Sequence, residues 1–328
     1  MLNEVNMNIL SRCGSQFEVL QGLEPTVGAL MARHKARPDM WFPSDLLPVN
    51  DCDDAREDDL RLLRRRARTL PDAVRVVLDM NIRTEEGLPH FHRLIAGVAK
   101  PGSNIGRWNY LWTAEEDRHG CVLRDYLRDA SILDMRAVEV RQFEYLCAGF
   151  DPAWAGGSPY EIFVYTTLQE KATQLSHQQT GKVAGDYEPT LAGILRKVAE
   201  DEAWHYAFYL ALIKAVLAVD PDGALVAAAR ILPHIDMPGL AMPDFRNYAE
   251  VAARLGVYTL RNYKDVVEKV IEVWGVGTLT HLGPAGGEAQ GTILTLPARL
   301  ETLARRTESR MKKKSFSFDV VRGRSFDL

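Results

Sequence analysis

The stretches EEDRH at residues 115–119 and DEAWH at residues 201–205 decide how this chain is expected to fold. Each contains a glutamate three residues before a histidine. On an α-helix, residues three apart lie on the same face, one turn from each other, so such a pair can bind one metal ion together. Two such helices, with one further glutamate from each of two others, form a site for two metal ions inside a four-helix bundle.

The glutamates and histidines of both stretches interrupt apolar helical rows. The buried row of a helix at about residues 106–130 reads Trp108, Trp112, Glu116, His119, Leu123 and Tyr126. The buried row of a helix at about residues 190–219 reads Leu191, Leu195, Val198, Glu202, His205, Tyr209, Leu212 and Val216. A single Glu-x-x-His occurs often by chance, but two of them centred on apolar rows predict a buried metal site.

A third candidate carboxylate lies on a helix that begins near Pro71. Apolar residues recur there at spacings of three and four, which puts Glu85 on the buried face. Glu86 lies only about 100° away around the helix, so the spacing leaves both residues open. The ring of Pro89 clashes with the carbonyl of Glu85, which indicates that the helix ends or kinks there, or that it opens beside a ligand.

The fourth candidate is Glu170, at the centre of an unusually polar helix face that follows residues 156–159. Thr173 and His177 share this face, and we interpret His177 as a residue that makes a structural hydrogen bond. The other five histidines show no metal-binding pattern, and we interpret them as surface or packing residues: His34, His90, His92, His234 and His281.

Charge balance favours two iron ions. Four buried glutamates would repel one another, and burying an unpaired carboxylate is costly. Two Fe(II) ions carry four positive charges, and one histidine for each ion completes the candidate ligand set: Glu85, Glu116, His119, Glu170, Glu202 and His205. Oxygen-rich ligation with one imidazole suits iron or manganese better than copper, and no nearby thiolate favours zinc.

The composition predicts a soluble, cytoplasmic protein. The chain has 328 residues, 46% of them apolar, and a net charge of -4, which gives no general reason to bind nucleic acid. Its four cysteines are scattered without a Cys-x-x-Cys, which suits a reducing compartment. We expect no signal peptide, and the longest apolar run, residues 209–219, is broken by Lys214 and too short to cross a bilayer.

The rest of the chain is expected to complete one mainly helical domain. We divide it into an N-terminal extension (about residues 1–60), a bundle core (70–220), C-terminal helices (221–306) and a basic tail (307–328). Before the core we expect a short helix (residues 17–34), a rigid extended segment (41–48), an acidic loop (51–59) and the start of a helix (61–68). The later helices are expected at about residues 224–232, 244–255, 262–274 and 285–306, and a small hairpin within residues 315–321. Arg64, Arg65 and Arg66 form either a solvated face or a docking patch for an acidic partner.

Four motifs carry a resemblance to a known family. WTAEEDRHG at residues 112–120 resembles W-T-A-E-E-N-R-H-G, and TEEGLP at residues 84–89 resembles T-E-[ED]-x-L-P. QEKAT at residues 169–173 and DEAWH at residues 201–205 are similar to Q-E-x-A-T and D-E-x-x-H. These are motifs of the soluble acyl-carrier-protein desaturases, the stearoyl type.

The resemblance implies an all-α fold, a ferritin-like four-helix bundle, in a homodimer without membrane insertion. It implies an enzyme that inserts a cis double bond into a saturated acyl chain on acyl carrier protein, using dioxygen, two iron ions and electrons from a ferredoxin. It carries the six ligands over, with Glu85 chosen in place of Glu86, and puts Thr173 on the oxygen side. It also implies that Asp201 accepts a hydrogen bond from His119 and that Trp41 lies on an electron route.

Two alternatives remain. The first is an oxygenase of the same fold, which would hydroxylate or N-oxidise its substrate with the same six ligands. The second is a ferritin-like protein that stores iron or has a structural role without catalysis. The acyl chain length, the double-bond position and the native electron donor are not encoded in these patterns.

The two Glu-x-x-His helices suggest an internal two-fold, so Glu115 is expected to orient His205 as Asp201 orients His119. A Glu115→Gln change should therefore lower the iron content of the purified protein, because an amide is a weaker acceptor for the ring N–H. Elemental analysis tests this. Iron content and activity at the wild-type level would contradict it.

Overall fold

The structure is a computed structural model that describes residues 16–37, 40–48, 53–152, 154, 158–233 and 238–328. Residues 16–22 are helical and lead into α2. The helices are α2 (Glu24–Lys35), α3 (Pro43–Leu46), α4 (Asp53–Ala67), α5 (Asp72–Glu85), α6 (Leu88–Ala96), α7 (Asn104–Ala130), α8 (Met135–Ala148), α9 (Pro159–Gly185), α10 (Pro189–Val219), α11 (Pro221–Ile231), α12 (Phe245–Arg254), α13 (Leu260–Trp274) and α14 (Pro284–Ser309). Three 3-10 turns are η1 (Pro238–Ala241), η2 (Val276–Thr278) and η3 (Asp319–Val321), and β1 (Ser315–Ser317) pairs antiparallel with β2 (Ser325–Asp327).

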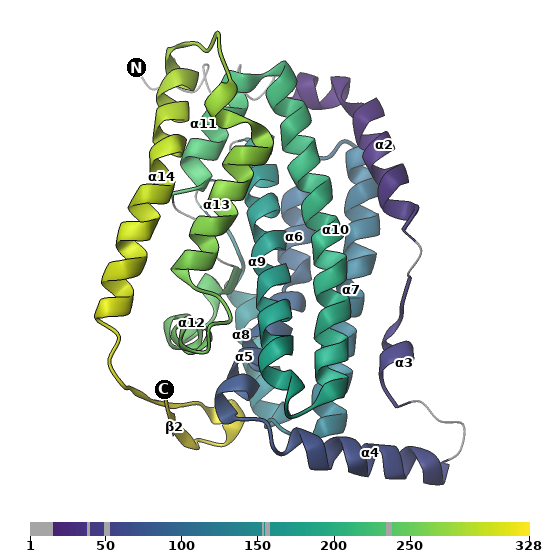
Figure 1. Cartoon of the computed structure of the whole chain (residues 1–328). Coiled ribbons are helices and arrows are strands. Elements are labelled where there is room, and N and C mark those ends of the chain that lie inside the picture. The colour runs from purple at the N-terminus through teal and green to yellow at the C-terminus, as the bar shows by residue number, and fades with distance from the viewer. Residues whose placement is uncertain (1–15, 38–39, 49–52, 153, 155–157, 234–237) are drawn as a thin grey trace.

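The predicted all-α bundle is confirmed. α7, α9 and α10 run side by side along the length of the molecule (Figure 1). α5 and α6 follow one another and together take the place of the fourth helix of the bundle (Figure 1). α11, α13 and α14 cover one side of the bundle, and α2 lies against α7 and α10 on another (Figure 1). The small hairpin lies near α5 and α12 at one end (Figure 1).

A polar belt divides the bundle interior into two apolar clusters. On α7, Trp112 belongs to one cluster and Leu123 to the other, and Glu116 and His119 lie between them. The same change of cluster occurs along α5 with α6, along α9 and along α10. Apolar burial on both sides of the belt therefore stabilises the four helices and fixes how the belt residues face each other.

The break between α5 and α6 places Glu85 at the end of a helix. α5 ends at Glu85, and Pro89 lies in the first turn of α6, where its missing N–H costs nothing. Gly87 lies in the connecting turn, and a Cβ there would come within 2.7 Å of the Tyr145 ring and 3.0 Å of the Thr84 carbonyl. The helix therefore ends before Pro89, as one account of this proline expected.

Three local predictions are wrong. Residues 41–48 are not all extended, because Phe42 N–H donates to Asp45 and starts the short helix α3. The described part of the predicted acidic loop, from Asp53, is the first half of α4, where acidic residues favour a helix N-terminus. The arginines of residues 61–68 therefore lie near the end of that helix and not at its start.

The hairpin forms with a different second strand from the one expected. The segment Asp319–Val321 is the turn η3, and β2 comes only after it. Arg322 and Gly323, with φ of 59° and 65°, take the left-handed conformation that reverses the chain. Phe316 of β1 then pairs with Phe326 of β2.

α10 is long and apolar enough to cross a membrane by length and composition, with a mean hydropathy of 1.2 over its best window. Its apolar stretch is longer than the run of residues 209–219 found in the sequence. In the structure α10 contacts α2, α7, α9, α11 and α13, and it carries Asp201, Glu202 and His205 on its buried face. These contacts place α10 at the centre of the bundle.

A buried charge pair within α5 makes a hydrogen bond to α12. Arg83 donates to Asp79 at 2.8 Å, both side chains are fully buried, and the Tyr248 hydroxyl of α12 donates to the same carboxylate oxygen at 2.7 Å. Removing one partner of such a pair leaves the other charge buried without compensation.

Arg83→Met should therefore destabilise the protein by about 3–5 kcal/mol. Arg196 offers a matched control, because it pairs with Glu200 at 2.7 Å and the same i,i+4 spacing on an exposed surface. Arg196→Met should cost only about 0.3–0.5 kcal/mol. Urea unfolding measures both, and equal losses would show that burial does not set the contribution of this pair.

Candidate metal centre

The structure brings the six predicted ligands together in the polar belt. Four helices supply them: Glu85 from α5, Glu116 and His119 from α7, Glu170 from α9, and Glu202 and His205 from α10. Each is at most 7% exposed. Gly120 helps α7 to approach α5, since a Cβ there would meet Glu86 at 3.3 Å.

The six residues form two overlapping groups. In each group, ligand atoms lie within 4.8 Å of one another. One group joins Glu85 and His119 to Glu116 and Glu202, and the other joins Glu170 and His205 to the same two glutamates.

The two shared glutamates each direct one oxygen at each imidazole. Glu116 lies 3.4 Å from Nδ1 of His119 through Oε2 and 2.8 Å from Nδ1 of His205 through Oε1. Glu202 lies 3.5 Å from His119 Nδ1 through Oε1 and 3.6 Å from His205 Nδ1 through Oε2. Carboxylates in this position can bridge two ions, and Glu85 and Glu170 can each bind one.

The polar atoms in the centre fit a pair of cations. Within the described part of the chain, Nδ1 of both histidines, Oε1 of Glu116 and Oε2 of Glu202 have no hydrogen-bond partner, although all are buried. Buried polar atoms normally have partners, so these four atoms call for a missing positive group. Nitrogen and oxygen ligands of this kind suit iron or manganese ions.

The hydrogen bonds around the centre fix how the imidazoles point. Nε2 of His205 donates to Glu115 at 2.8 Å, which is the contact expected from the internal two-fold, and Nε2 of His119 lies 3.4 Å from Asp201. With the proton on Nε2, each ring presents a free Nδ1 to the carboxylates. These outer carboxylates therefore select the ring nitrogen that could bind a metal.

The two unshared glutamates also have fixed orientations. His177 Nε2 donates to Glu85 at 2.7 Å, so His177 makes the hydrogen bond expected of it, and its partner is a candidate ligand. Trp112 Nε1 donates to Glu170 at 3.1 Å, a contact that the sequence did not reveal.

Burial and charge interactions raise the pKa values of three groups at the centre. Burial raises the pKa of Glu170 well above its ordinary range, and the charge of Glu202 adds to this effect. Burial alone would lower the pKa of His119, but the charge of Glu116 and the hydrogen bond to Asp201 raise it well above its ordinary value. The pKa of His205 is raised in the same way, chiefly by the hydrogen bond to Glu115.

Trp41 lies against the outer side of the centre. Its Nε1 donates to Asp201 at 2.9 Å, and its ring is stacked with that of His119 at a centroid distance of 6.0 Å. Arg118 donates to both the Trp41 carbonyl, at 2.6 Å, and Asp201, at 3.1 Å. Trp41 is 4% exposed, but its neighbours Met40 and Phe42 are 67% and 51% exposed.

A cavity opens beside the two shared glutamates. Thr173 lines it, and its hydroxyl lies 3.1 Å from the carbonyls of Gln169 and Glu170. The lining consists of Thr84, Glu85, Leu88, Phe91, Trp112, Glu116, Gln169, Thr173 and Glu202. It combines apolar walls with the candidate ligands and begins at the break between α5 and α6.

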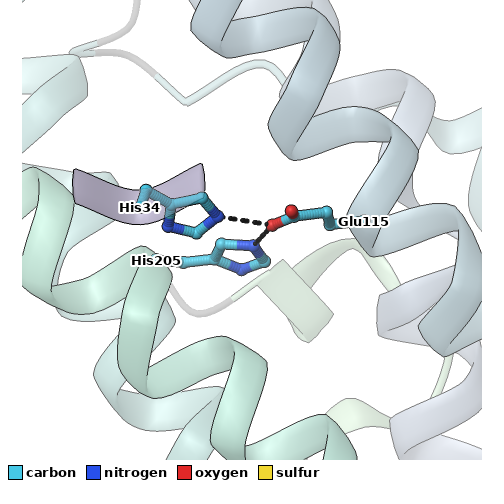
Figure 2. Close-up of side chains that lie close together, drawn as sticks. All are labelled: His34, Glu115 and His205. Atoms are coloured by element: carbon cyan, nitrogen blue, oxygen red, sulfur yellow. Dashed lines mark hydrogen bonds and ion pairs between the residues drawn. The ribbon is translucent and has the colours of Figure 1, made fainter. Parts of the chain in front are cut away.

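His34 has a role beyond the one expected from the sequence. It is not a surface residue, because it is 3% exposed, and it does more than pack, because its Nε2 lies 2.8 Å from Glu115, as Figure 2 shows. A signal was present, because His34 ends the apolar row of Val27 and Met31 on α2, just as His119 interrupts the row of α7. His234 lies outside the described residues.

The chain is similar to several known proteins over most of its length. Residues 15–322 match the family model described as "Fatty acid desaturase". A chloroplastic stearoyl-[acyl-carrier-protein] 9-desaturase from Olea europaea is 34% identical over 305 residues, which cover 88% of this chain and 77% of that protein. The stearoyl-[acyl-carrier-protein] 9-desaturase 3 of Arabidopsis thaliana is 37% identical over 310 residues, with 88% and 77% covered. This chain therefore belongs to the fatty acid desaturase family.

The fold agrees with a solved structure. DesA2 from Mycobacterium tuberculosis H37Rv, described as a "putative acyl-ACP desaturase", superposes with a TM-score of 0.57 over 83% of this chain and 99% of its own. At 23% sequence identity this likeness concerns the fold.

Metal binding at this centre should strengthen as pH rises. The ligands must lose protons to bind a metal, and the raised pKa values of His119 and His205 show that protons compete for Nδ1. Anaerobic calorimetric titration with Fe(II) at about pH 6 and about pH 8, in buffers of different ionisation enthalpy, should show tighter binding at the higher pH and release of protons. An affinity that is the same at both values would contradict this assignment of the ligands.

Proposed function

We propose that this protein is an O₂-dependent di-iron desaturase that inserts a cis double bond into the saturated acyl chain of an acyl-acyl carrier protein. Membership of the fatty acid desaturase family supports this, as do relatives named for stearoyl-[acyl-carrier-protein] 9-desaturation. The single observation that carries the proposal is the pair of overlapping ligand groups that share Glu116 and Glu202 inside the bundle.

The six ligands divide between two iron ions. Glu85 and His119 would bind one ion, Glu170 and His205 the other, and Glu116 and Glu202 both. Bound iron supplies the one-electron and dioxygen chemistry that amino-acid side chains lack. His177 and Trp112 hold Glu85 and Glu170 in their orientations through the hydrogen bonds described above.

The cavity beside the shared glutamates is the proposed place of the reacting methylenes. Leu88, Phe91 and Trp112 give it apolar walls, and its volume of about 10 Å³ means that these walls must move apart to admit a hydrocarbon chain. Because methylenes are chemically alike, the position of the chain in this cavity decides where the double bond forms. Thr173 lies on the cavity wall, on the proposed oxygen side.

Trp41 is the proposed entry point for electrons from a ferredoxin. The bonds from Trp41 to Asp201 and from Asp201 to His119 connect it with the centre. Exposed Met40 and Phe42 flank it and provide an apolar surface for a donor protein.

Docking of the acidic carrier protein by Arg64, Arg65 and Arg66 remains a prediction. Arg64 donates to the Asp129 carbonyl at 2.9 Å, and Arg66 donates to Glu188 at 2.8 Å, so both are engaged within the chain. Arg65 is exposed and is the best placed of the three. We also propose that the protein is soluble, cytoplasmic and homodimeric, and that the chain forms one domain.

Mass analysis of the reaction product tests the proposal. The purified protein with iron, a ferredoxin, its reductase, NADPH and O₂ should remove two hydrogens, about 2 Da, from a stearoyl-acyl carrier protein. Gain of one oxygen atom would identify an oxygenase. An unchanged substrate, together with growth of a mineral core in excess Fe(II), would identify an iron-storage protein.

A further inference from the structure

We propose that the C-terminal end of α2 and the residue just after it support the metal centre from outside: His34 and Arg37 hold Glu115 in place so that Glu115 positions His205. This inference rests on the proposed function, because it concerns how the iron-binding nitrogen of His205 is aimed. His34 and Arg37 are positioning residues, since neither reaches the centre itself.

Two hydrogen bonds and one ion pair meet at the Glu115 carboxylate. Nε2 of His34 and Nε2 of His205 each lie 2.8 Å from Oε2, and Arg37 lies 2.5 Å from Oε1 (Figure 2 shows the two imidazoles). The side chains of Arg37 and Glu115 are 8% and 6% exposed, so water offers little replacement for these contacts. A buried carboxylate with both oxygens engaged has one orientation.

The orientation of Glu115 decides which nitrogen His205 presents. An ionised carboxylate only accepts hydrogen bonds, so both imidazoles facing it carry their proton on Nε2. Nδ1 of His205 is then free to face Glu116, Glu170 and Glu202. If Glu115 turned away, no other described residue would hold the proton of His205 on Nε2.

Ring packing holds His34 in register with His205. The two rings are stacked at 5.8 Å with an angle of 17° between their planes. The edge of Trp108 meets His34 at 4.8 Å and 89°. Ring packing alone therefore fixes the plane of the His34 imidazole, so that its N–H points at Glu115 in one direction.

Arg37 connects the two halves of the centre. Its guanidinium contacts Glu115 at 2.5 Å and Asp201 at 3.0 Å, and these carboxylates serve His205 and His119 respectively. One cation therefore compensates both outer carboxylates and fixes the distance between them. Across the internal two-fold, Trp41 takes the place that corresponds to His34, because it donates to Asp201 and stacks on His119.

A third metal ion is the competing use of His34, Glu115 and His205, which form a compact group. Both Nε2 atoms make hydrogen bonds of 2.8 Å to Glu115, whereas Nδ1 of His205 lies equally near Glu116 without making one. The guanidinium of Arg37 on the other oxygen would also repel a cation. The geometry therefore favours positioning over metal binding.

Three variants of the full-length protein test the proposal. His34→Leu removes the donor, whereas His34→Gln keeps an N–H donor at a similar reach. His90→Leu is the matched control, because His90 is also a buried imidazole, 8% exposed, on a helix outside the ligand set. Arg37→Met removes the shared guanidinium and serves as a second variant if His34→Leu does not fold.

Each variant is titrated anaerobically with Fe(II), and binding is followed by near-infrared circular dichroism and chelator competition. His34→Leu and Arg37→Met should weaken binding of one of the two irons by about tenfold or more and shift its ligand-field bands. His34→Gln and His90→Leu should bind two irons as the wild type does. Thermal unfolding without iron separates these effects from a general loss of stability.

The possible failures are distinct. Unchanged affinity and bands in a folded His34→Leu would overturn the positioning role and leave the proposed function standing. Binding of three irons by the wild type and two by His34→Leu would replace positioning with a third metal site. Failure of the wild type to bind a pair of irons would overturn the proposed function itself.

Discussion

Mutual repulsion among four buried carboxylates is the constraint on which this structure depends. Glu85, Glu116, Glu170 and Glu202 converge in a belt that water hardly reaches. Such a group is unstable unless positive charge is added to it, either as protons or as cations. The raised pKa of both central imidazoles records the same demand. The apolar clusters on either side stabilise the bundle enough to hold these charges together.

A ring of donors and acceptors lies around that core and gives it a defined shape. Each unshared glutamate has one donor, from His177 or Trp112, and each imidazole faces an outer carboxylate. These partners lie on helices other than that of the residue they hold. The ligand geometry therefore depends on the packing of the whole bundle and not on any one helix, which explains why the belt interrupts every long buried row.

Much of the fold and of the centre could be predicted from the sequence, because helical periodicity and the Glu-x-x-His spacing are local properties. The helices expected at about residues 106–130 and 190–219 are α7 (Asn104–Ala130) and α10 (Pro189–Val219). Spacing could not choose between Glu85 and Glu86, since both lie near the buried face. His34 and Arg37 were missed because their partner Glu115 is distant in sequence, and such a contact has no periodicity. α3 and the first half of α4 were not expected to be helical, because their composition suggested an extended segment and a loop, whereas acidic residues favour helix N-termini there. The second strand of the hairpin was misplaced because the left-handed residues Arg322 and Gly323 reverse the chain only after η3.

The outer carboxylates are exchanged between the two central helices. Glu115 on α7 serves the histidine of α10, and Asp201 on α10 serves the histidine of α7. A slip of either helix by one turn, about 5.4 Å, would break both contacts at once. α7 and α10 can therefore make both of these buried contacts only in one longitudinal alignment, so the pair of carboxylates specifies the register of the two helices.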